Sequence, residues 1–308
     1  MELNDNTQQG LYRSSFEHDS CGVGYLAHLK GQKSHEIIDD ALTILENMEH
    51  RGACGCESDT GDGAGILLQI PHDFLKEECI KLDIQLTTAG DYGVGMIFFP
   101  KERASKYKCK ALIERAAEKM GLEILGYRAV PVNPSPIGVT ALSAEPFIQQ
   151  LFLARPEALT NDDDFERKLY VFKNYITKRI REELQESDSK DFYVVSFSHR
   201  IIVYKGQLTT FQVRQYFPDL TDARVKSAFG MVHSRFSTNT MPSWRLAQPF
   251  RFIAHNGEIN TLTGNLNWFY STVRSFASPY FTDEEMAMLL PVIDNNQSDS
   301  ACLDNVVE

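Results

Sequence analysis

The 308-residue sequence has no long hydrophobic run and no excess of positive charge. No stretch of about 18 apolar residues is present, so no segment is expected to span a membrane. The first 20 residues contain no apolar core of the kind found in secretory signals. The formal net charge is −11, which argues against nucleic acid as a partner because phosphate binding depends on Lys and Arg. We therefore expect a cytoplasmic protein that binds neither nucleic acid nor membrane.

Cysteine is scarce, and none of the six residues belongs to a paired motif. They are Cys21, Cys54, Cys56, Cys79, Cys109 and Cys302. Without an export signal, reduced thiols are expected rather than disulfides. His50, Cys54 and Cys56 lie close together in the sequence, but a fourth ligand and the usual Cys-x-x-Cys or His-x-x-x-His spacing are missing. We therefore predict no metal site.

Strand-like and helix-like patterns alternate along the whole chain. Strands are predicted at 25–28, 92–99, 122–130 and 147–154, and helices at 37–48, 102–120 and 161–184. Segments 192–197 and 201–204 flank a short turn and are predicted to form a hairpin. No repeat, linker or change in composition divides the chain, so one α+β domain is the simplest architecture.

A glycine-rich loop at 58–65 precedes the apolar run 66–68. Its glycines fit neither the dinucleotide fingerprint nor the P-loop, which ends in Lys-Ser/Thr. Its acidic residues do not complete a calcium loop, because no Glu stands at the closing position. We interpret the loop as tight turns that lead into a strand, and keep backbone approach to a substrate as the second interpretation.

Cys21 opens a segment of small and apolar residues after a polar leader. By itself this pattern is typical of a buried structural cysteine. If the bond between Ser20 and Cys21 is cut, however, Cys21 gains an α-amine with a reference pKa of about 7.7–8.0, beside a thiol of about 8.5. That amine can act as general base for the thiol. Residues 1–20 are then either a flexible tail or a short propeptide.

Polar groups in the last quarter of the chain complete a set of complementary charges. Arg235 follows one apolar, strand-like segment, the Asn256-Gly257 pair follows another, and Asp299 precedes an apolar stretch. An Asn-Gly pair after a strand usually forms a hairpin turn, and such an Asp usually caps a helix. Alternatively, the Asn256 side chain and the Gly257 N–H can form an oxyanion hole. Together the groups suit a small zwitterion with a side-chain carbonyl.

Several stretches of the sequence match a known family. They are Cys21-Gly22-Val23-Gly24, Glu49 to Ala53, Thr60 to Gly65, Ile202 to Gly206, His233 to Thr240, Leu246 to Phe250, His255 to Thr261 and Ser298 to Ser300. On these stretches the sequence resembles the glutamine amidotransferase domain of the glutamate synthase large subunits, which are class II amidotransferases and N-terminal-nucleophile hydrolases. The resemblance covers residues 21–308. The long insertion between Cys21 and Arg235 agrees with it, since shorter amidotransferases place this Arg closer to the nucleophile.

The resemblance implies a four-layer αββα sandwich with the N-terminal residue at a strand end between the sheets. It also implies that residues 1–20 are a propeptide removed autocatalytically, and that the freed Cys21 is the nucleophile with its own amine as base. Asn256 and Gly257 would form the oxyanion hole. The glutamine substrate would be bound by Arg235 at the α-carboxylate, by Asp299 at the α-ammonium, and by Phe236 and Thr238 in the pocket wall.

The activity that the resemblance implies is hydrolysis of L-glutamine to L-glutamate and ammonia. In the family, the ammonia passes to a synthase domain that carries FMN and an iron–sulfur cluster, where it adds to 2-oxoglutarate. Neither cofactor is expected in this chain, so we interpret 21–308 as one domain of a longer polypeptide. Its partners would be those synthase domains and, as a further candidate, a small electron-donor subunit. Two alternatives stay open: a class II amidotransferase with another ammonia acceptor, and a non-catalytic glutamine-binding regulatory module.

Overall fold

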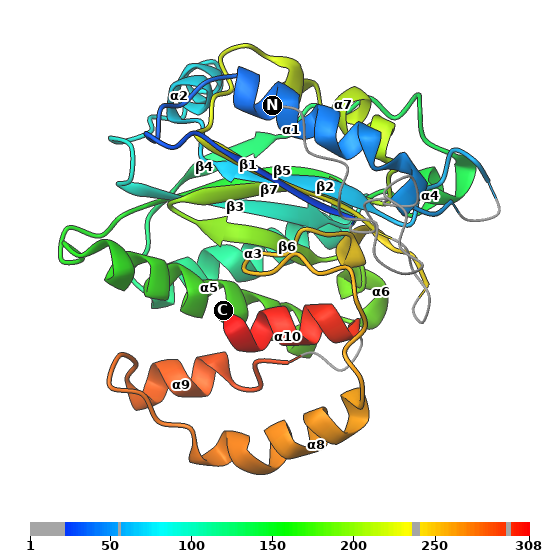
Figure 1. The fold of residues 1–308 in the computed structure, drawn as a ribbon. Helices are drawn as coiled ribbons and strands as arrows, with labels where there is room; N and C mark the ends of the chain where they lie inside the picture. The colour runs from blue at the N-terminus through cyan, green and yellow to red at the C-terminus, as the bar shows by residue number, and fades with distance from the viewer. Residues whose placement is uncertain (1–21, 55–56, 236–240, 294–296) are drawn as a thin grey trace, which may run out of the picture.

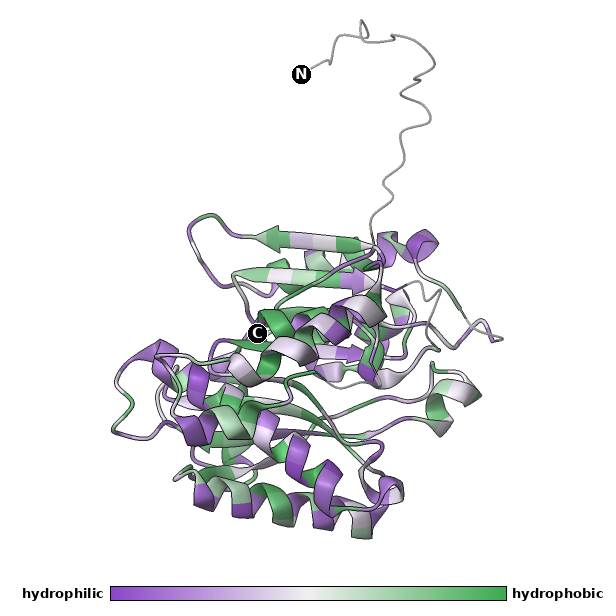
Figure 2. Cartoon of the chain, turned by 90° about the horizontal axis from the view of Figure 1, so that it is seen from below, coloured by the Kyte–Doolittle hydropathy of each residue, from purple (hydrophilic) through white to green (hydrophobic). Residues whose placement is uncertain are grey.

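The computed structural model describes residues 22–54, 57–235, 241–293 and 297–308. Two four-stranded antiparallel sheets lie face to face, and helices cover the outer face of each (Figure 1). The strands are largely hydrophobic, whereas the helices carry hydrophilic residues on their outward sides (Figure 2). The predicted leader, residues 1–20, and the predicted site residues Cys21, Phe236 and Thr238 lie outside the described ranges.

The first sheet has the strand order β1 (Val23–Ala27), β8 (Phe229–Ser234), β2 (Ala64–Gln69), β7 (Ile201–Gly206). Its outer face is covered by α1 (Glu36–Asn47) and α7 (Thr210–Tyr216) (Figure 1). Helix α1 packs against the sheet because its apolar residues recur at helical spacing: Ile38, Ala41, Leu42 and Leu45 are all buried.

The second sheet has the order β4 (Ile124–Ala129), β5 (Phe147–Ala154), β3 (Tyr92–Phe99), β6 (Tyr193–Ser198). Helices α3 (Arg103–Lys119) and α5 (Asp162–Glu183) cover it on the side away from the first sheet (Figure 1). Every residue of β3 is buried, because one face meets the first sheet and the other meets these helices. The predicted αββα sandwich and the strands and helices predicted in this half are confirmed.

The hairpin predicted across 192–204 is wrong. Strand β6 pairs with β3 in the second sheet, whereas β7 pairs with β2 in the first. The turn between them is a corner at which the chain crosses from one sheet to the other, and the Ser198 hydroxyl accepts the N–H groups of Arg200 (2.9 Å) and Ile201 (3.2 Å) there. Two apolar strands joined by a short turn look alike in sequence whether they pair with each other or diverge.

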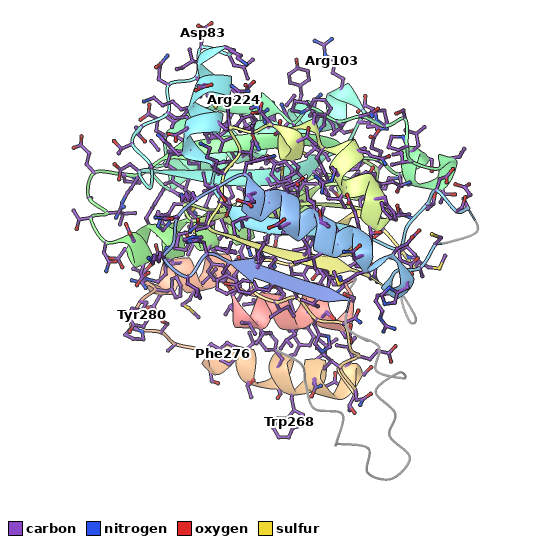
Figure 3. All side chains as sticks on the ribbon, turned by 45° about the horizontal axis from the view of Figure 1, so that its top comes forward. Asp83, Arg103, Arg224, Trp268, Phe276 and Tyr280 are labelled. Carbon is purple, nitrogen blue, oxygen red and sulfur yellow. The ribbon has the colours of Figure 1, made fainter. Side chains whose placement is uncertain are left out.

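After β8 the chain leaves the sandwich and adds helices α8 (Leu262–Thr272), α9 (Asp283–Leu289) and α10 (Asp299–Val307). The strand-like pattern before Asn256 does not form a strand. Residues 252–260 belong to neither a helix nor a strand. Helix α8 buries none of its residues, and the Trp268 side chain projects from it into solvent (Figure 3). Tyr280, which follows α8 in the chain, is also largely exposed, and Phe276 is partly exposed.

Shorter elements connect these layers. They are α2 (His72–Ile80), α4 (Val139–Ser143) and α6 (Glu186–Ser189), with 3-10 turns at Glu49–Arg51, Pro218–Thr221, Trp244–Leu246 and Val273–Ser275. None of the helices in the described ranges combines the length and the apolar composition that crossing a membrane requires.

Candidate active site

The residue after the predicted nucleophile is fixed where β1 and β8 meet. The Gly22 carbonyl accepts the N–H of Ser234 at 2.7 Å, and Val23 lies opposite His233 in the antiparallel register. Cys21 itself is outside the described residues. Its chain neighbour therefore anchors the candidate site at this end of the first sheet.

Asn256 lies directly beside Gly22. A Cβ added to Gly22 would stand 2.8 Å from Asn256 Oδ1 and 2.4 Å from the Ser234 carbonyl oxygen. Real Cβ contacts are not this short, so the backbone at Gly22 approaches Asn256 in a way that only glycine permits. The structure thus brings Asn256 to Gly22, the residue that follows the predicted nucleophile, although more than 200 residues separate the two in the sequence. The pair sits in an irregular segment and not in a hairpin turn.

Arg235 follows the last residue of β8 and is buried, with 6% of its surface exposed. Its N–H donates to the Gly63 carbonyl at 2.9 Å, which ties the residue to the glycine-rich loop. Burial lowers the pKa of the Arg235 guanidinium, and the charges of Asp62 and Asp299 partly offset that effect. Two of the predicted substrate-binding residues, Arg235 and Asp299, are therefore close enough to interact. The pocket residues predicted next to Arg235, Phe236 and Thr238, lie outside the described ranges.

Asp299 is the first residue of α10, whose N-cap is Ser298. The predicted helix begins at this point, but its cap is Ser298 and not Asp299: the Ser298 hydroxyl accepts the Ala301 N–H at 3.3 Å. Asp299 itself reaches outward: its Oδ2 accepts the N–H of Ile259 at 2.6 Å, and its Oδ1 accepts the N–H of Ser300 at 2.7 Å. Asp299 thereby joins α10 to the chain that follows Asn256 and Gly257.

The glycine-rich loop leads into β2, as predicted, and its glycines allow another segment to approach. At Gly63 (φ +137°) an added Cβ would stand 2.9 Å from Ala247, and at Gly65 it would stand 2.9 Å from the Gln248 carbonyl oxygen. The segment at 247–248 therefore rests on the start of β2. The sequence showed the turns but not the segment that needs them.

Two buried polar side chains that the sequence did not single out contact the residue before Asn256. The His233 imidazole and the Gln248 amide both bond to the main chain of His255. His233 is one of several polar residues in an apolar strand, and Gln248 lies within a stretch that carried the family resemblance. Only that resemblance could have drawn attention to Gln248.

The described cysteines do not fit an iron–sulfur cluster, which needs thiolates from several Cys residues at one place. They lie on separate elements: Cys54 in a loop, Cys79 on α2, Cys109 on α3 and Cys302 on α10. Burial raises the pKa of Cys79 to about 11 and that of Cys109 to about 12, so both stay as thiols at neutral pH. Within the described ranges, no three His, Cys, Asp or Glu side chains gather as a metal ion would require.

Comparison with known proteins gives one family. The family described as "Glutamine amidotransferases class-II" matches residues 21–308. The chain is 45% identical over 300 residues to "Glutamate synthase [NADPH] large chain" of Bacillus subtilis, which covers 97% of this chain and 19% of that protein. It is 47% identical over 312 residues to "Glutamate synthase [NADH]" of Saccharomyces cerevisiae, covering 98% and 14%. It is 39% identical over 292 residues to "Ferredoxin-dependent glutamate synthase 2" of Synechocystis, covering 95% and 18%. The chain thus spans less than a fifth of the length of each of these relatives.

Proposed function

The chain belongs to the class II glutamine amidotransferases, and we propose that it hydrolyses L-glutamine to L-glutamate and ammonia with Cys21 as the nucleophile. The observation that carries this proposal is the contact of the Asn256 side chain with Gly22, the residue bonded to Cys21. An amide donor beside a nucleophile is the arrangement that acyl transfer from an amide needs.

The reaction starts with the α-amine of Cys21, which takes the thiol proton. The thiolate attacks the side-chain amide carbon of glutamine, and the carbonyl electrons move to the oxygen. The resulting oxyanion accepts hydrogen bonds from the Asn256 amide and the Gly257 N–H. The ammonium of Cys21 returns the proton to the leaving nitrogen as ammonia departs, and water then hydrolyses the γ-glutamyl thioester.

The charged groups near the site suit the other end of the substrate. Arg235 binds the α-carboxylate of glutamine in this proposal, since a guanidinium pairs with a carboxylate through two parallel hydrogen bonds. Asp299 binds the α-ammonium. Their mutual proximity supports the assignment, because the two charges of an amino acid are separated by a single carbon. We further propose that Phe236 and Thr238, which follow Arg235 closely in the sequence, contribute to the glutamine pocket.

The base exists only after the Ser20–Cys21 bond is cut, so residues 1–20 act as a propeptide in this proposal. The Cys21 thiol attacks the Ser20 carbonyl, and the Ser20–Cys21 C–N bond breaks to give a thioester and the free Cys21 amine. Hydrolysis of that thioester releases residues 1–20 and regenerates the thiol. Intact-mass analysis of active protein tests this step. Activity in protein that retains residues 1–20 would contradict it.

The longer polypeptide that contains this domain would use the ammonia. We propose that synthase domains in that polypeptide, carrying FMN and an iron–sulfur cluster, add ammonia to 2-oxoglutarate in the cytoplasm. The names of the relatives support this assignment. A small electron-donor subunit is a further partner in this proposal.

A glutaminase assay tests the central proposal. Protein that begins at Cys21 should release ammonia and glutamate from L-glutamine in equal amounts, and Cys21→Ala should not. Cys54→Ala is the matched control, because Cys54 is the exposed cysteine among the described ones and lies in a loop. Glutamine binding by calorimetry without turnover would favour the regulatory module. Turnover in the full-length polypeptide with ammonia transfer to an acceptor other than 2-oxoglutarate would favour another amidotransferase.

A further inference from the structure

The proposed oxyanion donor stands on a segment without regular secondary structure. Residues 252–260 form neither a helix nor a strand, so no ladder of backbone hydrogen bonds fixes Asn256. A donor contributes to catalysis only if it is held close to its productive geometry before the charge develops. Some other group must therefore hold this segment, and its bonds can be followed residue by residue.

Gln248 makes two hydrogen bonds to the main chain of one residue. Its Oε1 accepts the His255 N–H at 3.0 Å, and its Nε2 donates to the His255 carbonyl at 3.0 Å. The side chain is buried, with 5% of its surface exposed. A primary amide can serve both groups at once because it carries an acceptor and a donor in one plane. Gln248 thus holds His255 as a neighbouring strand would, immediately before Asn256.

His233 approaches the same carbonyl from the first sheet. Its Nε2 lies 2.9 Å from the His255 oxygen, and because a carbonyl only accepts, Nε2 carries the proton. His233 lies on β8 opposite Val23, so this bond connects the irregular segment to the strand that pairs with β1 directly after Gly22. Burial lowers the pKa of His233 to about 4, so the ring remains neutral under physiological conditions.

Gln248 is itself held at the sheet. Lys205 of β7, 1% exposed, donates from Nζ to the carbonyls of Ala247 (2.6 Å) and Arg245 (3.1 Å). The carbonyl of Gln248 lies against Gly65 of β2. Strands β7 and β2 therefore fix the backbone at Gln248. Its side chain, held in place in this way, positions the main chain of His255 through the two hydrogen bonds.

We infer that Gln248 is a positioning residue for the oxyanion hole: its side-chain amide fixes the main chain of His255 and so aims Asn256 and Gly257 at the reacting carbonyl. This inference rests on the proposed glutaminase function. It assigns Gln248 an effect on the step in which charge develops and not on the binding of glutamine.

The test is the Gln248→Glu variant of the protein that begins at Cys21. A carboxylate keeps the shape and accepts from the His255 N–H, but it cannot donate to the His255 carbonyl. We expect kcat to fall by about 10- to 100-fold while KM stays within about threefold, since a misplaced donor costs up to about 10² and ground-state binding is untouched. A protonated carboxyl restores the donor. The ratio of variant to wild-type kcat should therefore rise as the pH is lowered from about 8 to about 5.5.

Gln212→Glu is the matched control. Gln212 is also buried, and its amide also bonds only to main-chain groups: Nε2 donates to the carbonyls of Asp59 and Pro136, and Oε1 accepts the Thr209 N–H. It should lower the unfolding temperature at least as much as Gln248→Glu, yet keep kcat within about threefold of the wild type. An equal loss of kcat in both variants would overturn the inference.

A second readout separates positioning from damage to the nucleophile. Iodoacetamide alkylates a thiolate by displacement at carbon and forms no oxyanion, so Gln248→Glu should leave the rate of Cys21 alkylation unchanged in peptide mass mapping. Slowed alkylation, an unchanged kcat, or a kcat ratio that is flat with pH would each refute the role of Gln248. A wild-type protein without glutaminase activity would refute the proposed function instead.

Discussion

Asp299 has two separable tasks in the proposed function, and two substitutions tell them apart. Its negative charge is assigned to the α-ammonium of glutamine, while its Oδ2 accepts the N–H of Ile259, two residues after Gly257. Asp299→Asn removes the charge but keeps an oxygen that can accept from Ile259. Asp299→Ala removes both. Their comparison therefore measures substrate binding and loop positioning in one experiment.

The expected magnitudes follow from the two interactions. A hydrogen bond to a charged group contributes about 1.5–3 kcal/mol, so losing the carboxylate should raise KM by roughly 10- to 150-fold in both variants. This bond is the same in ground and transition states, so kcat of Asp299→Asn should remain appreciable. In Asp299→Ala the Ile259 N–H also loses its acceptor. We expect its kcat to fall a further 10- to 100-fold or so, because the oxyanion donors are displaced.

The assay is steady-state glutaminase kinetics with a matched control at another helix N-terminus. Glu102 caps α3 and accepts the N–H and the hydroxyl of Ser105, both at 2.6 Å, much as Asp299 Oδ1 accepts from Ser300. Glu102→Ala should lower the unfolding temperature, because it removes a helix cap, and leave both kinetic constants unchanged. Equal kcat values for Asp299→Asn and Asp299→Ala would refute the positioning task. An unchanged KM in both would refute the assignment to the ammonium.

Three further predictions concern the nucleophile, its neighbour and acid stability. A glutamine analogue with an electrophilic side-chain carbon should label Cys21 and not Cys54 in peptide mass mapping; label on Cys54 would point to another nucleophile. Gly22→Ala should lower kcat by about 10-fold or more, because the new Cβ would meet Asn256 Oδ1 at 2.8 Å; steady-state kinetics like those of the wild type would contradict this close approach. The pKa of His233 is about 4 in the fold against an ordinary 6.5, so the unfolded chain binds the proton first. The free energy of unfolding should therefore fall by up to about 3 kcal/mol as the pH is lowered from 6.5 toward 4. In His233→Gln, urea unfolding at a series of pH values should show a smaller fall over this range.

The fold was predictable where hydrophobic periodicity is long and uninterrupted. Helix α5 and strand β5 fall almost where the sequence placed them, since a long amphipathic face or a continuous apolar run between turn signals has one simple solution. The predicted hairpin failed at a connection between two strands. The chain reverses between β6 and β7 to enter the other sheet, and no local pattern encodes which partner a buried strand will choose.

In the candidate site, too, local sequence patterns predicted some features, whereas others depend on tertiary structure. Arg235 at a strand end and Asp299 at a helix start were placed by local signals, and both are confirmed in those positions. The contact of Asn256 with Gly22 and the bonds from Gln248 to His255 depend on tertiary structure. The family resemblance supplied the first of these, while the second appears only when the chain is folded.

Strand β1 pairs only with β8 among the strands of the described ranges, and β8 begins about 200 residues later. A ribosome adds about 5–20 residues per second, so roughly 10–40 s pass between the synthesis of β1 and the synthesis of β8. Asn256 and Asp299 emerge later still. During that interval Gly22 has neither the Ser234 N–H nor Asn256 beside it. If the Ser20–Cys21 bond is cut as proposed, a cleavage that needs these groups can occur only after the chain has been synthesised as far as Asn256.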